Sequence, residues 1–233
     1  MENLNEQDVL QDESNFLDAK LQRRSFLQYA GAGAAVVALT AAGCRKDRIN
    51  TPMTGVTLDF KDDFGVLNYA YALEQLEAAF YIQVASAPPS SFSAAEKAYF
   101  QDIQYHEIAH REFFKNALGT AAIGSLSVDF SSIDFTSRTS VLGAAMAFED
   151  LGVGAYNGAG VRLKNTIYLL AAGKIVSVEA RHAAYIRDLI SNGTFATAPQ
   201  VSSDKGLDMA LTPDVVLGAA GKYIKTKINV INL

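Results

Sequence analysis

The chain has 233 residues, of which 49% are hydrophobic and 19% charged, with a formal net charge of −5. Residues 1–43 hold 3 basic and 6 acidic side chains, which leaves 17 basic and 19 acidic ones in the remainder and no lysine or arginine run. A nucleic-acid partner is therefore not expected, because no basic surface would attract it. The single cysteine, Cys44, excludes an intramolecular disulfide.

The first 44 residues are typical of an export signal rather than of a folded domain. The segment Arg23-Arg24-Ser-Phe-Leu27 resembles a twin-arginine signal, whose translocon carries proteins that have already folded. The apolar stretch over residues 29–42 is short and rich in small residues, which makes it a poor permanent transmembrane helix. We therefore expect the protein to be exported.

Cys44 follows Ala41-Ala42-Gly43 at the end of this apolar stretch, an arrangement that resembles a bacterial lipobox. The leucine usual three residues before the cysteine is replaced by Ala41. We expect a periplasmic or cell-envelope lipoprotein, attached to the membrane through a lipid on Cys44. The alternative is a soluble exported protein cut nearby by an ordinary signal peptidase. Residues 45–61 are then expected to be a tether.

Four long helices are predicted from apolar periodicity and capping residues, over residues 62–87, 93–119, 137–160 and 165–192. Pro88-Pro89 ends the first, and Ser93 with Glu96 forms a capping box for the second. Short links make the first two and the last two helices antiparallel hairpins, while residues 119–136 are long enough to cross the length of a bundle. The domain is expected over residues 62–192, with a C-terminal extension over 193–233 in which residues 214–223 form a short helix.

Two of the three histidines lie three residues after a glutamate. The pairs are Glu107 with His110 and Glu179 with His182, and each lies in a predicted helix, where this spacing puts both side chains on one face. The predicted helix before each pair carries a glutamate on its apolar stripe, Glu74 before the first pair and Glu149 before the second. One glutamate from each of two helices plus Glu-x-x-His from the other two is a dinuclear carboxylate pattern of four-helix bundles. The candidate metal ligands are Glu74, Glu107, His110, Glu149, Glu179 and His182.

An internal repeat relates the two predicted hairpins. Residues 72–81 align without gaps on residues 147–156, with Ala, Glu, Leu and Tyr identical, and residues 107–110 align on 179–182. The hairpins therefore look like two copies related by a pseudo-two-fold axis, and each copy supplies three ligands.

The candidate carboxylates lie on apolar helix faces, so they are expected to be buried. An unpaired buried carboxylate costs several kcal/mol of folding free energy. Two cations bound among four carboxylates and two imidazoles would offset that cost. The alternative is that these glutamates are protonated or salt-bridged core residues, with Arg111 and Arg181 as the nearest partners. Oxygen and imidazole ligands without thiolates suit Fe or Mn. Two such ions are the expected cofactors.

These motifs, from Leu73-Glu74 to Tyr81, His106-Glu107-x-x-His110, Glu149 to Tyr156 and Val178-Glu179 to His182, resemble the ferritin-like domain family. The nearest branch is that of exported bacterial proteins related to plant desiccation-related proteins. The resemblance implies an all-α, ferritin-like four-helix bundle of two pseudo-two-fold hairpins joined by a long crossover. It also implies oxidation of Fe(II), or consumption of peroxide or dioxygen, at a two-metal site.

Two function classes compete at this stage. One is a dimetal oxidoreductase of ferroxidase, peroxidase or catalase type, with O₂ or H₂O₂ as partner. The other is a non-catalytic envelope protein with structural metals and a stress- or desiccation-related binding role. We expect Glu107 and Glu179 to bridge and Glu74 and Glu149 to serve one metal each. The sequence leaves open the roles of Glu77, Tyr81 and Tyr156 and a homo-oligomeric state, and it predicts His106 to lie off the ligand face.

Overall fold

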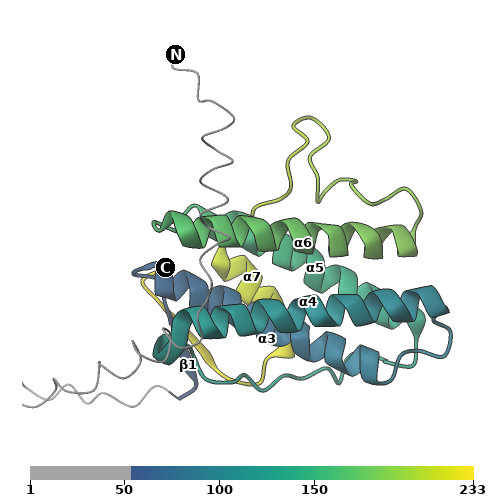
Figure 1. The fold of residues 1–233 in the computed structure, drawn as a ribbon, viewed down its shortest axis with the longest axis horizontal. Helices are drawn as coiled ribbons and strands as arrows, with labels where there is room; N and C mark the ends of the chain where they lie inside the picture. Colours follow the sequence, from purple (N-terminus) through teal and green to yellow (C-terminus); the bar gives the residue numbers. More distant parts are fainter. Residues whose placement is uncertain (1–53) are drawn as a thin grey trace, which may run out of the picture. The chain divides into compact units, whose positions relative to one another are not determined.

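A computed structural model describes residues 54–233 (Figure 1). The expected export signal and Cys44 lie outside these residues. The four predicted long helices are present, with ends within two residues of the predicted ones. In chain order the elements are β1 (Val56–Asp59), α3 (Asp63–Ser86), α4 (Ala94–Leu118), the 3-10 turn η1 (Gly119–Ala121), α5 (Arg138–Gly160), α6 (Thr166–Ile190), α7 (Pro213–Ala220), the 3-10 turn η2 (Gly221–Tyr223) and β2 (Ile228–Ile231).

A side-chain cap fixes the start of each long helix. Asp62 accepts from the backbone N–H groups of Phe64 and Gly65 at the start of α3. The predicted capping box of α4 is complete, because the Ser93 hydroxyl accepts from Glu96 N and the Glu96 carboxylate accepts from Ser93 N. Ser137 and Asn165 cap α5 and α6 in the same way, through the N–H groups of Ser140 and Ile167. These caps satisfy N–H groups that have no partner inside the helix.

The helices pack as two pairs, α3 against α4 and α5 against α6, with α4 and α6 in front of α3 and α5 in the view of Figure 1. Helix α3 is buried on nearly every side, with 17 of its 24 residues buried, so it is the central helix of the bundle. Among residues 54–233, no helix combines the length and the apolar character needed to cross a membrane.

Two amide side chains of α3 hold the long crossover between α4 and α5. Asn68 donates to Ala121 O at 2.9 Å and accepts from Ile123 N at 2.8 Å. Two turns further on, Gln75 accepts from Leu126 N at 2.9 Å. The crossover then places Phe130 against Phe80 of α3, with ring centroids 5.9 Å apart. The crossover thus lies along α3.

A two-stranded parallel sheet joins both ends of the domain. Val56 to Asp59 of β1 pair in register with Ile228 to Ile231 of β2. Leu58 of β1 is fully buried and Phe60 is 7% exposed, so this segment belongs to the core. Residues 56–59 lie in the segment that the sequence predicts to be a tether. They have a structural role because β2, far away in the sequence, supplies the hydrogen-bond partners that a single strand lacks.

The C-terminal extension covers the outer side of α5. Leu211 N donates to Gly154 O at 2.8 Å, and a Cβ placed on Gly158 would lie only 1.8 Å from Leu211 O. The glycines at 154 and 158 therefore permit backbone contact along this side of α5. Helix α7 packs on the same helix and forms the predicted short C-terminal helix.

Candidate metal centre

All six predicted ligands meet inside the bundle. Glu74 comes from α3, Glu107 and His110 from α4, Glu149 from α5, and Glu179 and His182 from α6. The four glutamates have no exposed surface, His182 is 5% exposed, and the side chain of His110 is 11% exposed. Four helices that are far apart in the sequence thus direct carboxylate and imidazole groups into one buried volume.

The ligand atoms form two overlapping groups, in each of which they lie within 4.8 Å of one another. The first group contains Glu74 and His110, the second contains Glu149 and His182, and both contain Glu107 and Glu179. The two groups therefore follow the repeat, since each helical hairpin adds one glutamate and its histidine to the same group. The glutamates of the two Glu-x-x-His pairs are the shared members.

Both histidines turn Nδ1 toward the carboxylates. His110 Nδ1 lies 2.8 Å from Glu179 Oε1 and 3.6 Å from Glu74 Oε2. His182 Nδ1 lies 3.0 Å from Glu107 Oε1 and 3.3 Å from Glu149 Oε2. Neither nitrogen has a partner in hydrogen-bond geometry. Each Nδ1 atom therefore lies where a cation could bind it together with the carboxylates.

Many buried polar atoms of the site lack a hydrogen bond, which buried polar groups rarely do. They include both carboxylate oxygens of Glu107 and Glu179, and one oxygen each of Glu74 and Glu149. Four carboxylates with two neutral imidazoles are matched in charge by two divalent cations. The two arginines nearest in sequence do not serve these glutamates, because Arg111 pairs with Glu112 at 2.8 Å and Arg181 is exposed. The cluster could therefore hold metal, and its donors fit a hard or borderline cation.

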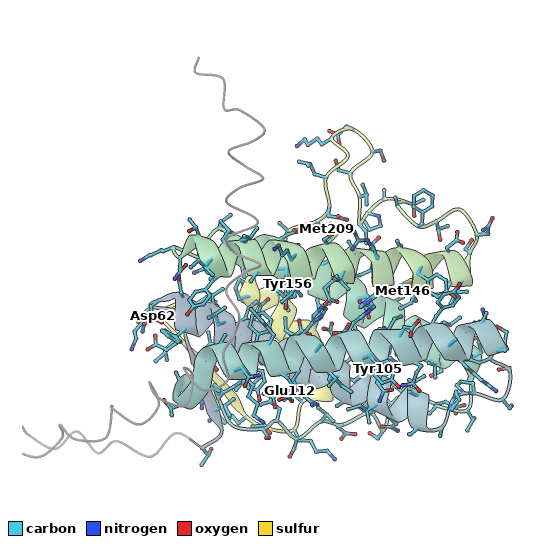
Figure 2. All side chains as sticks on the ribbon, in the orientation of Figure 1. Asp62, Tyr105, Glu112, Met146, Tyr156 and Met209 are labelled. Atoms are coloured by element: carbon cyan, nitrogen blue, oxygen red, sulfur yellow. The ribbon has the colours of Figure 1, made fainter. Side chains whose placement is uncertain are left out.

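Two tyrosines cross the bundle to hold the glutamates of α3 and α5. Tyr81 of α3 donates its hydroxyl to Glu149 Oε1 of α5 at 2.5 Å, and Tyr156 of α5 donates to Glu74 Oε1 of α3. Tyr156 lies in the interior of the bundle (Figure 2). Each glutamate keeps Oε1 on its tyrosine and leaves Oε2 free for the site. The aligned tyrosines of the repeat thus have equivalent roles in the two halves.

Glu77 is a fifth buried carboxylate, one turn after Glu74 on α3 and 4% exposed. It belongs to neither group of clustered ligand atoms. Burial and then the charges of Glu179 and Glu107 raise the pKa of Glu77 well above its usual range. A Cβ on Gly152, its counterpart in the repeat, would lie 3.0 Å from Glu77 Oε1. Glu77 therefore fills the space that a side chain at 152 would take.

His106 lies outside both ligand groups, as predicted, yet it contacts the site. Its Nδ1 is 2.9 Å from Nε2 of His182, on the opposite edge of that ring from the carboxylates. The sequence does not predict this contact. No local signal marks it, because the partner of His106 lies on another helix.

Without a metal, three of the four clustered glutamates have raised pKa values, namely Glu74, Glu107 and Glu149. Burial raises the pKa of Glu149 to about 7, although His182 opposes the rise. Burial and the charge of Glu179 likewise raise the pKa of Glu107 well above its usual range. Glu179 differs, because its contacts with the two histidines outweigh burial and lower its pKa to about 2. A cation that binds here must therefore displace protons.

The two histidines are held as imidazolium in the metal-free site. Burial alone lowers the pKa of His110, but Glu107, Glu179 and Glu74 outweigh it and raise the pKa to about 12. Burial also acts to lower the pKa of His182, but Glu149 and Glu107 outweigh it and raise the pKa to about 12. Protons thus occupy the nitrogen positions that face the carboxylates.

A small apolar cavity lies beside the site. It has a volume of about 20 Å³, and Tyr156 is one of its lining residues. A cavity of this size has room for about one small molecule, and apolar cavities tend to stay dry. The other lining residues are predominantly apolar and include Val66, Leu73, Phe114, Ala155 and Leu163.

The sequence profile of the ferritin-like domain matches residues 62–192, which hold all four long helices and all six clustered residues. The chain belongs to the ferritin-like domain family. Its fold is the four-helix bundle of that family, with a short C-terminal helix added. A search of curated proteins finds no match for this chain.

Proposed function

We propose that this protein binds two Fe or Mn ions in the cluster and uses them to oxidise Fe(II) or to consume peroxide or dioxygen. The observation that carries the proposal is the pair of ligand groups that share Glu107 and Glu179. One ion would be held by Glu74 and His110, the other by Glu149 and His182, with the shared glutamates serving both. Such ions, when bound, supply Lewis acidity and one-electron redox chemistry.

The protein's own residues would orient the ligands and limit access. The Tyr81 and Tyr156 hydroxyls hold one oxygen of Glu149 and Glu74, so that the second oxygen faces the site. The complete burial of the four glutamates excludes bulk water. It restricts the reaction to small molecules, and the apolar cavity beside Tyr156 suits a small apolar oxidant such as O₂.

Metal loading is the first test of the proposal. Purified protein offered Fe(II) or Mn(II) without oxygen should hold close to two ions per chain. The double variant Glu107→Gln, Glu179→Gln should hold none, because it removes the charge of both shared carboxylates at little change in volume. The control is Asp150→Asn on α5, which removes a carboxylate that pairs with Arg187 outside the cluster and should load normally. A wild type that takes up neither ion overturns the proposal.

Reaction with oxidants is the second test. The reduced di-iron form should be oxidised rapidly by O₂ or H₂O₂, or the dimanganese form should dismutate peroxide. His182→Ala should slow the reaction at least about tenfold, which corresponds to about 1.4 kcal/mol of activation free energy. If fully loaded protein consumes neither oxidant faster than free metal does, the metals have a structural role and the protein is a non-catalytic envelope protein.

We also propose that the protein is exported as a lipoprotein, on the basis of Arg23-Arg24 and Cys44. Replacing both arginines with lysine should keep the precursor in the cytoplasm, because lysine cannot reproduce paired guanidinium recognition. Cys44→Ser should release the exported protein from the membrane fraction. Retention of the serine variant in that fraction would contradict lipidation but not export.

A further inference from the structure

The contact between His106 and His182 is an in-plane hydrogen bond. The two rings are parallel to within 7°, their centroids are 5.1 Å apart, and Nδ1 of His106 lies 2.9 Å from Nε2 of His182. The centroid separation exceeds the nitrogen separation by about twice the distance from the centre of an imidazole to its edge. The facing nitrogens therefore lie on the line between the rings, which are edge to edge in nearly one plane rather than stacked face to face.

This bond determines which nitrogen of His182 can carry a proton. The Nδ1 edge of the ring faces Glu107 and Glu149, and the Nε2 edge faces His106. An imidazole that gives its Nδ1 lone pair to a cation carries its hydrogen on Nε2. Nε2 of His182 then donates to Nδ1 of His106, and His106 must carry its own hydrogen on Nε2.

The second half of the repeat has no equivalent residue. The position that corresponds to His106 is 178, where a valine has no side-chain atom that can hydrogen-bond. His110 therefore lacks the partner that His182 has. Because an acceptor on the remote nitrogen fixes the ring and makes it a stronger ligand, the two halves of the site differ.

We propose that His106 is a positioning residue that fixes the tautomer of His182 and makes the two metal positions unequal. The position served by His182 binds its ion more tightly than the position served by His110. The inference rests on the proposed function, since it concerns the ions that the cluster holds. His106 itself is exposed on α4 and does not belong to either ligand group, so it acts through His182 alone.

Two substitutions of His106 distinguish the effect of its hydrogen bond from the effect of its side-chain volume. His106→Asn retains an acceptor oxygen near the place of Nδ1, whereas His106→Leu fills similar space without an acceptor. The exposed neighbour Tyr105, labelled in Figure 2, provides the control Tyr105→Leu, which alters the same turn of α4 without contacting His182. Because positions 105 and 106 are exposed, each variant should fold, and circular dichroism checks this.

The hydrogen bond is tested first in the metal-free protein. Long-range ¹⁵N–¹H correlation NMR of histidine-labelled protein should show His106 as the Nε2–H tautomer. His106 carrying its hydrogen on Nδ1 would overturn the inference. This measurement does not depend on whether the cluster binds metal.

Metal binding is tested by calorimetric titration with Co(II), which reports both positions separately. The wild type and Tyr105→Leu should bind two ions with unequal affinity. His106→Leu should weaken the tighter position about 10- to 100-fold and leave the weaker one unchanged, and His106→Asn should restore most of the loss. In Co(II)-loaded protein, the shifted and exchange-protected Nε2–H signal of His182 should disappear in His106→Leu and persist in His106→Asn.

The outcomes distinguish this inference from the proposed function. If the wild type binds two ions and His106→Leu leaves both affinities unchanged, the role of His106 is overturned while the metal site stands. Equal weakening of both positions without rescue by asparagine also overturns it. A wild type that binds no Co(II), Fe(II) or Mn(II) overturns the proposed function and, with it, the claim of unequal positions.

Discussion

The hydroxyl of Tyr81 donates to Oε1 of Glu149 at 2.5 Å, which joins α3 to α5 in the interior of the bundle. Tyr156 and Glu74 form the same bond in the opposite direction. The two bonds tie the halves of the repeat together at the level of the metal ligands. They account for why each half has a tyrosine two turns after its glutamate.

Removing the Tyr81 hydroxyl should destabilise the protein. Tyr81→Phe leaves Oε1 of the buried Glu149 without its donor, so we expect a loss of about 1 to 3 kcal/mol in the free energy of unfolding. Tyr69→Phe is the control, because the Tyr69 hydroxyl is buried without a partner and its removal should cost little. Denaturant unfolding measures both. Equal losses in the two variants would contradict a specific role for the bond to Glu149.

Glu77 should be dispensable for metal loading. It lies outside both groups of ligand atoms, and its raised pKa favours a neutral carboxyl, which glutamine reproduces in shape and charge. Glu77→Gln should therefore retain about two ions per chain, whereas Glu107→Gln should lose at least one. Metal analysis of the loaded proteins decides the matter. A Glu77→Gln variant that holds one ion would make Glu77 a ligand.

The metal-free protein should lose stability as pH rises from about 4.5 to 7. The pKa of Glu149 is raised in the folded state to about 7, so its protonated form stabilises the fold at low pH, and this stabilisation is lost as pH rises through that value. The raised pKa values of His110 and His182 act in the same direction above pH 6.5. Melting temperatures should fall by at least about 3 °C across this range.

The variant Glu149→Gln checks the origin of that pH dependence. Glutamine does not titrate, so the melting temperature of the variant should fall less steeply with pH than that of the wild type. Metal-loaded wild type should show the opposite trend, because protons compete with the cations at low pH. Parallel curves for the wild type and Glu149→Gln would show that Glu149 does not carry the effect.

Two glycines of α5 should respond in opposite ways to alanine. Gly143→Ala adds a methyl group that meets no atom within 4 Å and reduces the freedom of the unfolded chain, so it should stabilise by about 0.5 to 1 kcal/mol. Gly158→Ala places a Cβ 1.8 Å from Leu211 O, a backbone atom, and should destabilise by about 1 to 3 kcal/mol. Thermal unfolding of both variants tests the packing of the C-terminal extension.

The sequence was sufficient for those features that depend on local spacing. Helix ends followed from caps such as Ser93 with Glu96, and the clustered residues followed from helical faces and the repeat. The caps and the helical faces each lie within a few turns of one helix, and the repeat compares two such segments. The ligand role of these residues stays a prediction, since clustering alone does not establish that metal is bound.

Features that depend on long-range pairing were not predicted. The hydrogen bond from Asn68 to the crossover joins residues more than 50 positions apart, and the one between His106 and His182 joins α4 to α6. Strand β1 has too few residues to be recognised without β2. In each case the contact depends on how the helices are packed, which periodicity within a single segment does not determine.

The pairing of β1 with β2 has a consequence for the order in which the domain can be completed during synthesis. Strand β1 precedes every described helix and β2 follows every one, so a ribosome makes the two partners with the whole bundle between them. Each helical hairpin can form from nearby residues, but the parallel sheet requires the most distant contact in the domain. Leu58 and Phe60 therefore lack their final β2 neighbours until the last strand has emerged. A nascent chain can thus have a formed helical bundle while β1 is still unpaired, because β2 has not yet been synthesised.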